Sequence, residues 1–466
     1  MSPVARFVSD RNALVSLLLI NGLIAALGFL YGFEYKYPAA WQGAVFRAGT
    51  TVWLVGLVLL SWLRWSDAVG PRATPAHLDR AGAWLATCQL VITLFFFLPS
   101  RSAVIAGAAL GAAGWMARRR WGAGGQYAVV VASGFALFAT SILVTPLDPA
   151  RADMLPAIAF AIDAFVAGRN PYAVSYQSIT ANPFFYPPYQ WLAFAPPRLL
   201  GLDVRIVNLL CAAAMVAFVE RACRRNGGHD GLRAGIYPVM FSAMALPMMH
   251  SGQVWPYWLA ITVAGILALR GSWVGAVAAL AAAAGMRQTA LIPIIIILVA
   301  LIAGTAPRDW LRAGLAAALI LGIELVPVAL LSPASLHHIF IDGPALALAR
   351  RPPDGNPLDQ VAVSNFLYRF GAAGSAVLLE ALAAAAFLPL AWMAGRIGTG
   401  RIVATAGLAY LVVISFNPYL HRYYYVAGLL LVGIGIAPGM DRVPLTGSAE
   451  RAARYPRRQV ITDDTA

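Results

Sequence analysis

The chain has 466 residues, of which 60% are hydrophobic and only 12% are charged, and its mean hydropathy is +0.71. A soluble domain carries roughly 25% charged residues, so this composition excludes a fold whose main solvent is water. The net charge of +14 comes almost wholly from arginine. These arginines flank apolar segments, which is the positive-inside pattern of membrane proteins and not a nucleic-acid-binding stripe.

Apolar segments recur along the whole chain. A membrane-spanning helix needs about 20 mostly apolar residues, and about fourteen segments approach that length. The period-two alternation of an outer-membrane strand is absent, so the sequence predicts an all-α polytopic membrane protein, a bundle of about 14 transmembrane helices. The approximate spans are 14–32, 49–64, 83–98, 102–117, 127–145, 204–220, 234–249, 255–270, 273–286, 289–304, 313–331, 374–394, 402–416 and 422–437.

The arginines also predict the orientation. If the N-terminus is cytoplasmic and the spans alternate, clusters such as Arg118–Arg120 and the basic tail at 441–466 fall on the cytoplasmic side. An even number of spans returns the C-terminus to that side. The tail is polar and is predicted to be disordered.

Two long segments, 145–203 and 332–371, are then left on the outer, non-cytoplasmic face. Shorter polar elements emerge on the same face, and this convergence is the main functional signal of the predicted topology. Residues 1–122 carry few polar groups within their spans and are interpreted as an accessory N-terminal transmembrane bundle. Residues 123–440 are interpreted as the working unit.

The first outer loop contains the most informative stretch. It places Asp153 directly after a predicted span, continues for about four apolar helical turns, and breaks into a loop rich in Asn, Pro and Tyr. The helical part is predicted to lie at the interface, with Pro156 tolerated in its first turn. The apolar end of the loop, 186–202, is interrupted by two Pro pairs and fits a re-entrant or interfacial segment better than a span.

Several short motifs follow one another in a recognisable order. They are Asp153, Gly168–Arg169–Asn170–Pro171–Tyr172, Tyr186–Pro187–Pro188, Gly252–Gln253 and Arg287–Gln288–Thr289. In this order the chain resembles the GT-C superfamily of polyprenyl-phosphate-sugar-dependent glycosyltransferases, and within it the bacterial mannosyltransferase-like glycosyltransferase family 87. The resemblance covers roughly residues 127–304. It departs from the family pattern in one respect. In the family the catalytic acid follows the first span, where this chain has Glu34, whereas the matching acid Asp153 follows the fifth predicted span.

The resemblance implies an inverting hexosyltransferase at the outer face of the bacterial inner membrane. Its donor is a sugar on a polyprenyl phosphate, mannose by default, and its acceptor is a glycolipid or glycan. Asp153 is the expected general base. A leaving phosphate needs cations and not a proton, and arginine suits it through its bidentate fork.

The candidate substrate-binding residues collect on the predicted outer face. They are Asn170, Tyr172, Tyr186, Gln253, Arg287, Gln288, Arg350, Arg351, His421 and Arg422. No cofactor, metal ligand set or nucleic-acid partner is predicted, and the need for a divalent metal is left open.

Simpler interpretations of the same residues stay open. Asp153 also fits an N-cap of the following helix, and Asp148, Asp163 and Glu34 are rivals for the role of base. The run Tyr423–Tyr425 fits an aromatic belt at the membrane interface. At the level of function, the alternatives are a flippase or transporter of a lipid-linked sugar and an O-antigen-ligase-like transferase.

Overall fold

The computed structural model describes residues 12–36, 51–63, 75–147, 154–173, 184–225, 231–342, 375–417 and 422–436. Within these ranges every regular element is a helix, and the predicted apolar segments fall on helices, although segment 234–249 is divided between Gly231–Met240 and Pro247–His250. The all-α class is therefore confirmed. By length and composition, four helices are able to cross a membrane, whereas the total of fourteen spans stays a prediction. The four are α4 (Ser100–Val144), α8 (Ile206–Arg225), α14 (Pro307–Leu331) and α18 (Ser375–Ile397).

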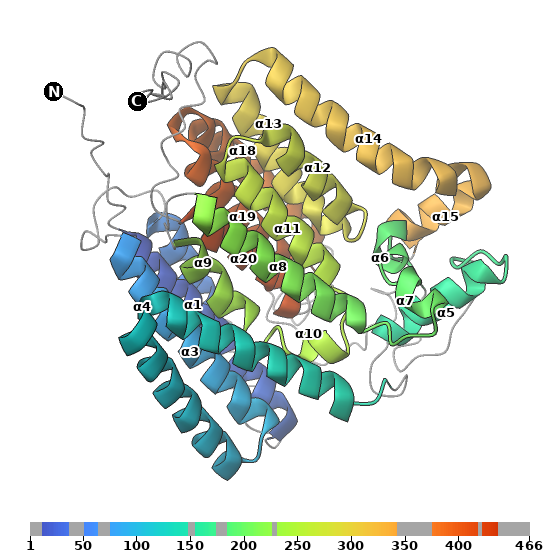
Figure 1. The fold of residues 1–466 in the computed structure, drawn as a ribbon. Coiled ribbons are helices and arrows are strands. Elements are labelled where there is room, and N and C mark those ends of the chain that lie inside the picture. The colour runs from blue at the N-terminus through green and yellow to red at the C-terminus, as the bar shows by residue number, and fades with distance from the viewer. Residues whose placement is uncertain are drawn as a thin grey trace, which may run out of the picture.

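The N-terminal helices pack along one side of the bundle. They are α1 (Ala13–Lys36), Thr51–Leu63, α3 (Pro75–Phe97) and α4 (Figure 1). Gly122 breaks α4 into two halves with φ 70°, a left-handed conformation that glycine adopts without a Cβ penalty. The two predicted segments of this region are thus one helical run with a sharp bend beside Arg118–Arg120.

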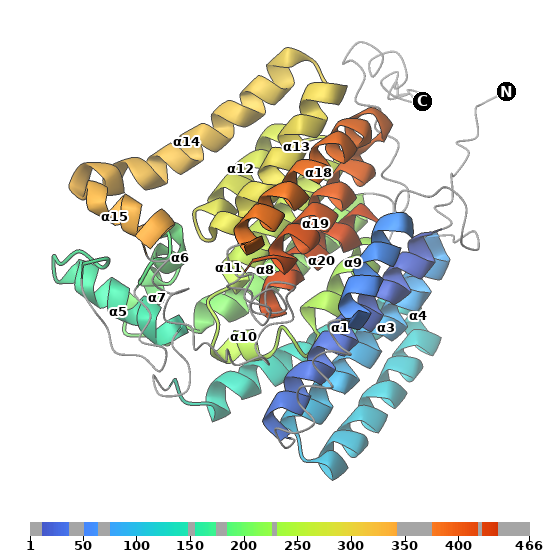
Figure 2. The same cartoon turned by 180° about the vertical axis from the view of Figure 1, so that it is seen from behind.

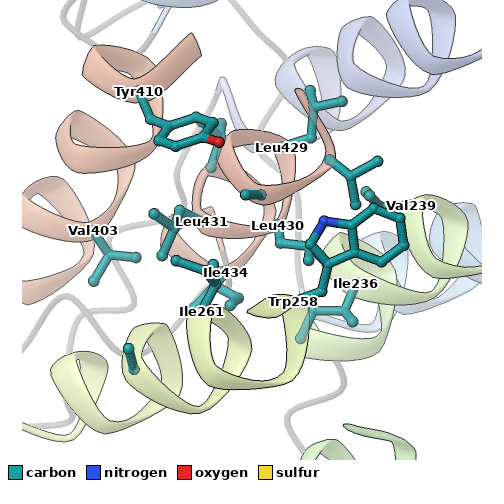
Figure 3. Packing of buried hydrophobic residues seen from close by; sticks show 14 of the residues in the cluster. Ile236, Val239, Trp258, Ile261, Val403, Tyr410, Leu429, Leu430, Leu431 and Ile434 are labelled. Atoms are coloured by element: carbon teal, nitrogen blue, oxygen red, sulfur yellow. The ribbon is translucent and has the colours of Figure 1, made fainter. Parts of the chain in front are cut away.

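Four helices form the centre of the molecule. They are α9 (Gly231–Met240), α11 (Trp255–Leu269), α19 (Thr399–Ser415) and α20 (Tyr425–Gly435), whose apolar side chains interlock in Figure 3. Every residue of α20 is buried, as expected for a helix that is apolar all round. Gly235 and Gly433 face each other so closely that a Cβ on either would overlap the other's backbone. Small residues therefore permit the close crossing of α9 and α20.

A second group of helices flanks the centre. It contains α12 (Trp273–Ala284), α13 (Leu291–Gly304), α14 and α18. After its charged first turns, α14 exposes apolar side chains that recur at helical spacing, at Leu315, Leu319, Ile323, Val326 and Leu330. An apolar stripe of this kind is expected to face lipid and not water.

The buried core is continuous across the proposed boundary at residue 122. One cluster of contacting apolar side chains runs from Ala13 to Ile436, and α3 packs directly against α9. The division into an accessory bundle and a working unit therefore remains an interpretation of the sequence. The tail 441–466 lies outside the described residues.

Short elements gather at one end of the bundle. They are α5 (Met154–Val166), α6 (Pro188–Leu192), α7 (Ala195–Leu199), α10 (Pro247–His250), α15 (Pro333–His337), the 3-10 turns η1 (Gln288–Ala290) and η3 (Arg422–Tyr424), and the π turn η2 (His338–Asp342). Both views show α5, α6 and α7 side by side, next to α15 (Figures 1 and 2). The predicted helix containing Pro156 is confirmed as α5, and segment 186–202 forms two short helices and not a span.

Candidate functional site

The two predicted outer loops contact each other at this end of the bundle. The Nδ2 of Asn170, in the first loop, donates to the Oγ of Ser335 in the second at 2.9 Å. The Nε2 of His338 lies 3.1 Å from the carbonyl oxygen of Phe184. Segments about 160 residues apart thus form one surface, as expected if both loops lie on one side.

The Gly-x-Asn-Pro-Tyr motif organises the first loop. Gly168 ends α5 with φ 70°, and the N–H of Arg169 reaches back to the carbonyl of Ala164, which is a Schellman-type helix end. The Oδ1 of Asn170 accepts from the backbone N–H of Tyr172 at 3.0 Å. The Tyr172 hydroxyl donates to the carbonyl of Tyr186 and accepts from the Nε1 of Trp191. The polar atoms of Asn170 and Tyr172 are therefore used to hold the loop.

The segment 186–190 connects this loop to three polar positions of the bundle. The ring of Tyr186 lies 5.6 Å from the guanidinium carbon of Arg287. The backbone N–H of Tyr189 donates to the Oε1 of Glu324 at 2.9 Å. The Nε2 of Gln190 donates to the backbone carbonyl of Gln253 at 2.6 Å. The Tyr-Pro-Pro motif and α6 thus join the turn before α11, the helix α14 and the turn after α12.

Arg287 is the central side chain of this arrangement. It lies in extended backbone between α12 and η1, and its side chain is packed so that only 3% of the residue is exposed. Its guanidinium carbon is also 5.4 Å from the ring centre of Tyr423 and 4.6 Å from that of Tyr424. Cations are attracted to aromatic faces at such distances. Three tyrosines, from two loops, therefore enclose one arginine.

The hydrogen-bonding capacity of Arg287 is not met by protein. Its Nε and Nη2 are buried and have no hydrogen-bond partner among the described residues, and no carboxylate there pairs with it. Burying an unpaired charge is costly. Cation–π contacts contribute only about 0.5–2 kcal/mol each. The arrangement is suited to binding an anion, which would supply the missing acceptors.

Three hydroxyls lie next to Arg287. The Tyr257 hydroxyl donates to that of Tyr410 at 3.2 Å, and the Thr289 hydroxyl is 3.4 Å from the first and 3.3 Å from the second. They connect α11 and α19 to the turn that carries Arg287. Its neighbour Gln288 donates through Nε2 to the carbonyl of Ile339, in η2, at 3.4 Å. The turn is thus fixed from both sides.

Two fully buried amides near α6 also lack partners. Both polar side-chain atoms of Gln253 and the Oε1 of Gln190 are without hydrogen bonds in the described part of the chain. Asn208 holds the turn before Gln253, since its Nδ2 donates to the carbonyl of Gly252 at 2.7 Å. Buried amides with free capacity fit hydroxyl-rich ligands.

The proposed base, Asp153, lies outside the described residues, as do Asp148, Arg350, Arg351 and His421. Arg422 opens η3, and Glu34 is in α1, but the description does not extend to either side chain. The residue after Asp153 is described: the Sδ of Met154 is 3.5 Å from the hydroxyl of Tyr423, whose ring flanks Arg287. The chain therefore passes the arginine site one residue after the predicted acid.

Asp163, and His337 of the second outer loop, have local partners. Asp163 forms a bidentate ion pair with Arg198 at 2.9 and 2.6 Å, and this arginine lowers the pKa of the Asp163 carboxyl. The Nδ1 of His337 is 2.8 Å from Asp342. Across the described ranges, no group of three His, Cys, Asp or Glu side chains is placed to hold a metal ion.

Sequence reasoning missed part of the site. The run Tyr423–Tyr425 was interpreted only as fitting an aromatic belt, whereas Tyr423 and Tyr424 stack on each other and flank Arg287. Tyr425 is fully buried against Trp53. The contact of α6 with Glu324 was also missed, because no local signal links residues 135 positions apart.

Comparison with known proteins adds no neighbour: no family model, no curated protein and no solved structure matches this chain.

Proposed function

We propose that this chain is an integral membrane glycosyltransferase that moves a sugar from a polyprenyl phosphate to a glycolipid or glycan acceptor. One observation carries the proposal. Arg287 is buried beside three tyrosine rings, and two of its nitrogens have no hydrogen-bond partner among the described residues, while its neighbour Gln288 contacts the second outer loop at Ile339. A phosphate on a lipid is an anion that reaches a buried guanidinium from within the membrane.

The reaction needs one base and one phosphate site. An acceptor hydroxyl attacks the anomeric carbon, its proton passes to the carboxylate of Asp153, and the bond between that carbon and the phosphate oxygen breaks. The electron pair leaves with the polyprenyl phosphate, and Arg287 stabilises the added charge. The contact between Met154 and Tyr423 supports this pairing, because Asp153 precedes Met154 in the chain.

The side of the membrane and the sugar also belong to the proposal. The arginine distribution supports an outer-face site, with both termini in the cytoplasm. Mannose rests on the family resemblance alone. Single cysteines at Ser178 and Gly355, introduced after the three native cysteines are replaced by alanine, should both react with an impermeant thiol reagent added outside. Reaction at one position alone would refute the topology.

The decisive test is transfer of a labelled sugar from synthetic polyprenyl-phosphate sugars by membranes that contain the protein. The unaltered chain should transfer label to lipid or glycan. Asp153→Asn should lose about 10²–10⁴-fold, the usual contribution of a general base, with unchanged expression and unfolding temperature. Asn retains capping ability, so the variant separates the two roles of Asp153.

The matched control is Asp163→Asn, in the same loop. Its carboxylate is committed to Arg198 on the surface, so transfer should be nearly unchanged. Near-normal transfer by Asp153→Asn would eliminate this residue as the base. Absence of transfer from any lipid-linked sugar would refute the proposed function itself.

A further inference from the structure

Glu324 is a buried acid that the proposed reaction does not use. It lies near the end of α14, and only 3% of it is exposed, although the lipid-facing side of the same helix is entirely apolar at Leu319, Ile323 and Val326. Its Oε1 accepts the backbone N–H of Tyr189. Its Oε2 is buried and has no hydrogen-bond partner within the described residues. An acid placed within an apolar helix is costly and marks a functional position.

Glu324 also lies beside the turn that carries Arg287. A Cβ added at Gly285 would overlap the Oε1 and Oε2 of Glu324, so the carboxylate rests directly against this glycine. Gly285 is two residues before Arg287. Yet no salt bridge within 4.0 Å joins the two charges in the part of the chain that the structure describes. The acid thus lies against the turn that carries the arginine, and within the described residues neither charge takes up the hydrogen-bonding atoms of the other.

The segment 186–190 contacts both charges. Tyr186 stacks on Arg287, and three residues later Tyr189 binds Glu324 through its N–H and the carbonyl of Ile320 through its hydroxyl at 3.3 Å. A ligand that satisfies both charges must carry an anion at one end and a hydrogen-bond donor at the other. A sugar phosphate has this pattern, with hydroxyl donors on the ring.

We propose that the Oε2 of Glu324 accepts a hydrogen bond from a ring hydroxyl of the donor sugar whose phosphate is bound by Arg287. This rests on the proposed function and assigns Glu324 as the residue that selects the sugar. Binding a sugar that lacks this hydroxyl would leave the buried carboxylate without a hydrogen bond, which costs free energy. The site therefore rejects such sugars. Because Oε2 is buried, the hydroxyl reaches it when α6, held to α14 by two hydrogen bonds, moves aside.

The test compares the unaltered protein with Glu324→Gln, using the full donor and a series of monodeoxy donors. Glutamine is nearly isosteric and retains an oxygen for the N–H of Tyr189, so the fold contact survives. With the full donor the variant should lose about 10- to 100-fold in kcat/KM, the effect of one charge-assisted hydrogen bond. With one particular deoxy donor the two proteins should be nearly equal, because the partner of Glu324 is already missing.

Two further variants sharpen the test. Gly285→Ala should lose the preference for the full donor over the deoxy donor, as Glu324→Gln does. The added methyl group would displace the carboxylate of Glu324. Glu380→Gln is the matched control: this acid is in α18 and its Oε1 already accepts from the Nδ2 of Asn417 at 3.2 Å. It should discriminate among donors as the unaltered protein does.

Other outcomes overturn the assignment. An equal loss by Glu324→Gln with every donor would mean that Glu324 acts on the reacting bond or on folding and not on a sugar hydroxyl. The same comparison can be made with monodeoxy acceptors. If the two proteins were equal with one deoxy acceptor, and with none of the deoxy donors, Glu324 would bind the acceptor and not the donor sugar. Both outcomes presuppose transfer by the unaltered protein, so they are distinct from failure of the proposed function, in which no donor is used.

Discussion

Two arginines of this chain, Arg233 and Arg287, are surrounded very differently. Arg233, at the start of α9, binds both oxygens of Glu220 at 2.8 and 2.5 Å, and the Tyr237 hydroxyl donates to the same carboxylate at 2.7 Å. Arg287 is buried more deeply and is flanked by aromatic rings, and no carboxylate of the described residues pairs with it. The first joins α8 to α9. The Nε and Nη2 of the second have no hydrogen-bond partner in the part of the chain that the structure describes.

The difference separates structure from function. A buried ion pair satisfies the hydrogen bonds of both partners, and its loss is felt as lost stability. An arginine whose nitrogens are left without acceptors adds a cost that the fold does not recover. We therefore interpret the Glu220–Arg233 pair as structural and Arg287 as a ligand-binding residue. The predictions below test this contrast.

The largest effect is expected for Arg287→Ala. The apparent KM for the donor should rise about 100-fold, because charge-assisted hydrogen bonds to the phosphate are lost, while the acceptor KM stays nearly constant. Arg287→Lys should recover part of the loss, since charge returns without the fork. Steady-state transfer kinetics with each substrate varied in turn measure both constants. A rise in the acceptor KM alone would mean that Arg287 does not bind the donor phosphate.

Arg233→Ala should act on stability instead. Removing one partner of a buried pair costs about 3–5 kcal/mol, and with side chains that are 15% and 24% exposed the cost should be nearer 2–3 kcal/mol. Unfolding of the purified protein in detergent should show this loss. The donor KM of the folded fraction should stay unchanged, and a large change in it would remove the contrast between the two arginines.

Arg287→Met should leave stability unchanged or raise it by about 1 kcal/mol, since replacing an uncompensated buried charge by an apolar side chain removes its desolvation cost. The unfolding temperature without substrate is the readout. A clear decrease would show that the tyrosine box needs the cation for folding, and Arg287 would then resemble Arg233.

The smallest effect belongs to the exposed pair Asp163–Arg198. Both side chains are nearly half exposed, so Asp163→Asn should cost only about 0.2–1 kcal/mol. Arg198 lowers the pKa of Asp163, so this contribution is present above the usual carboxyl pKa and is lost as the pH falls through the lowered one. Unfolding of the variant and the unaltered chain should therefore converge in acid. A difference that persists there would exclude the ion pair as its source.

Part of the site could be predicted from the sequence. Tyr186, Gln253 and Arg287 were selected by the order of short motifs, and the structure places all three around α6. Asn170 and Tyr172 were selected by the same reasoning, but their polar atoms hold the loop. A motif thus marks the position of a residue more reliably than its role, because the role depends on which partners satisfy its hydrogen bonds.

The sequence by itself determined the all-α class. Long apolar segments act within a few residues, and helices form on them, whereas the continuous run through the bend at Gly122 and the short helices of 186–202 were not predicted. Only the tertiary structure decided that two nitrogens of Arg287 have no partner among the described residues and that Glu324 meets Tyr189 across 135 residues. Such contacts depend on how all the helices pack together, and nearest-neighbour patterns carry no information about which buried polar atoms are left unpaired.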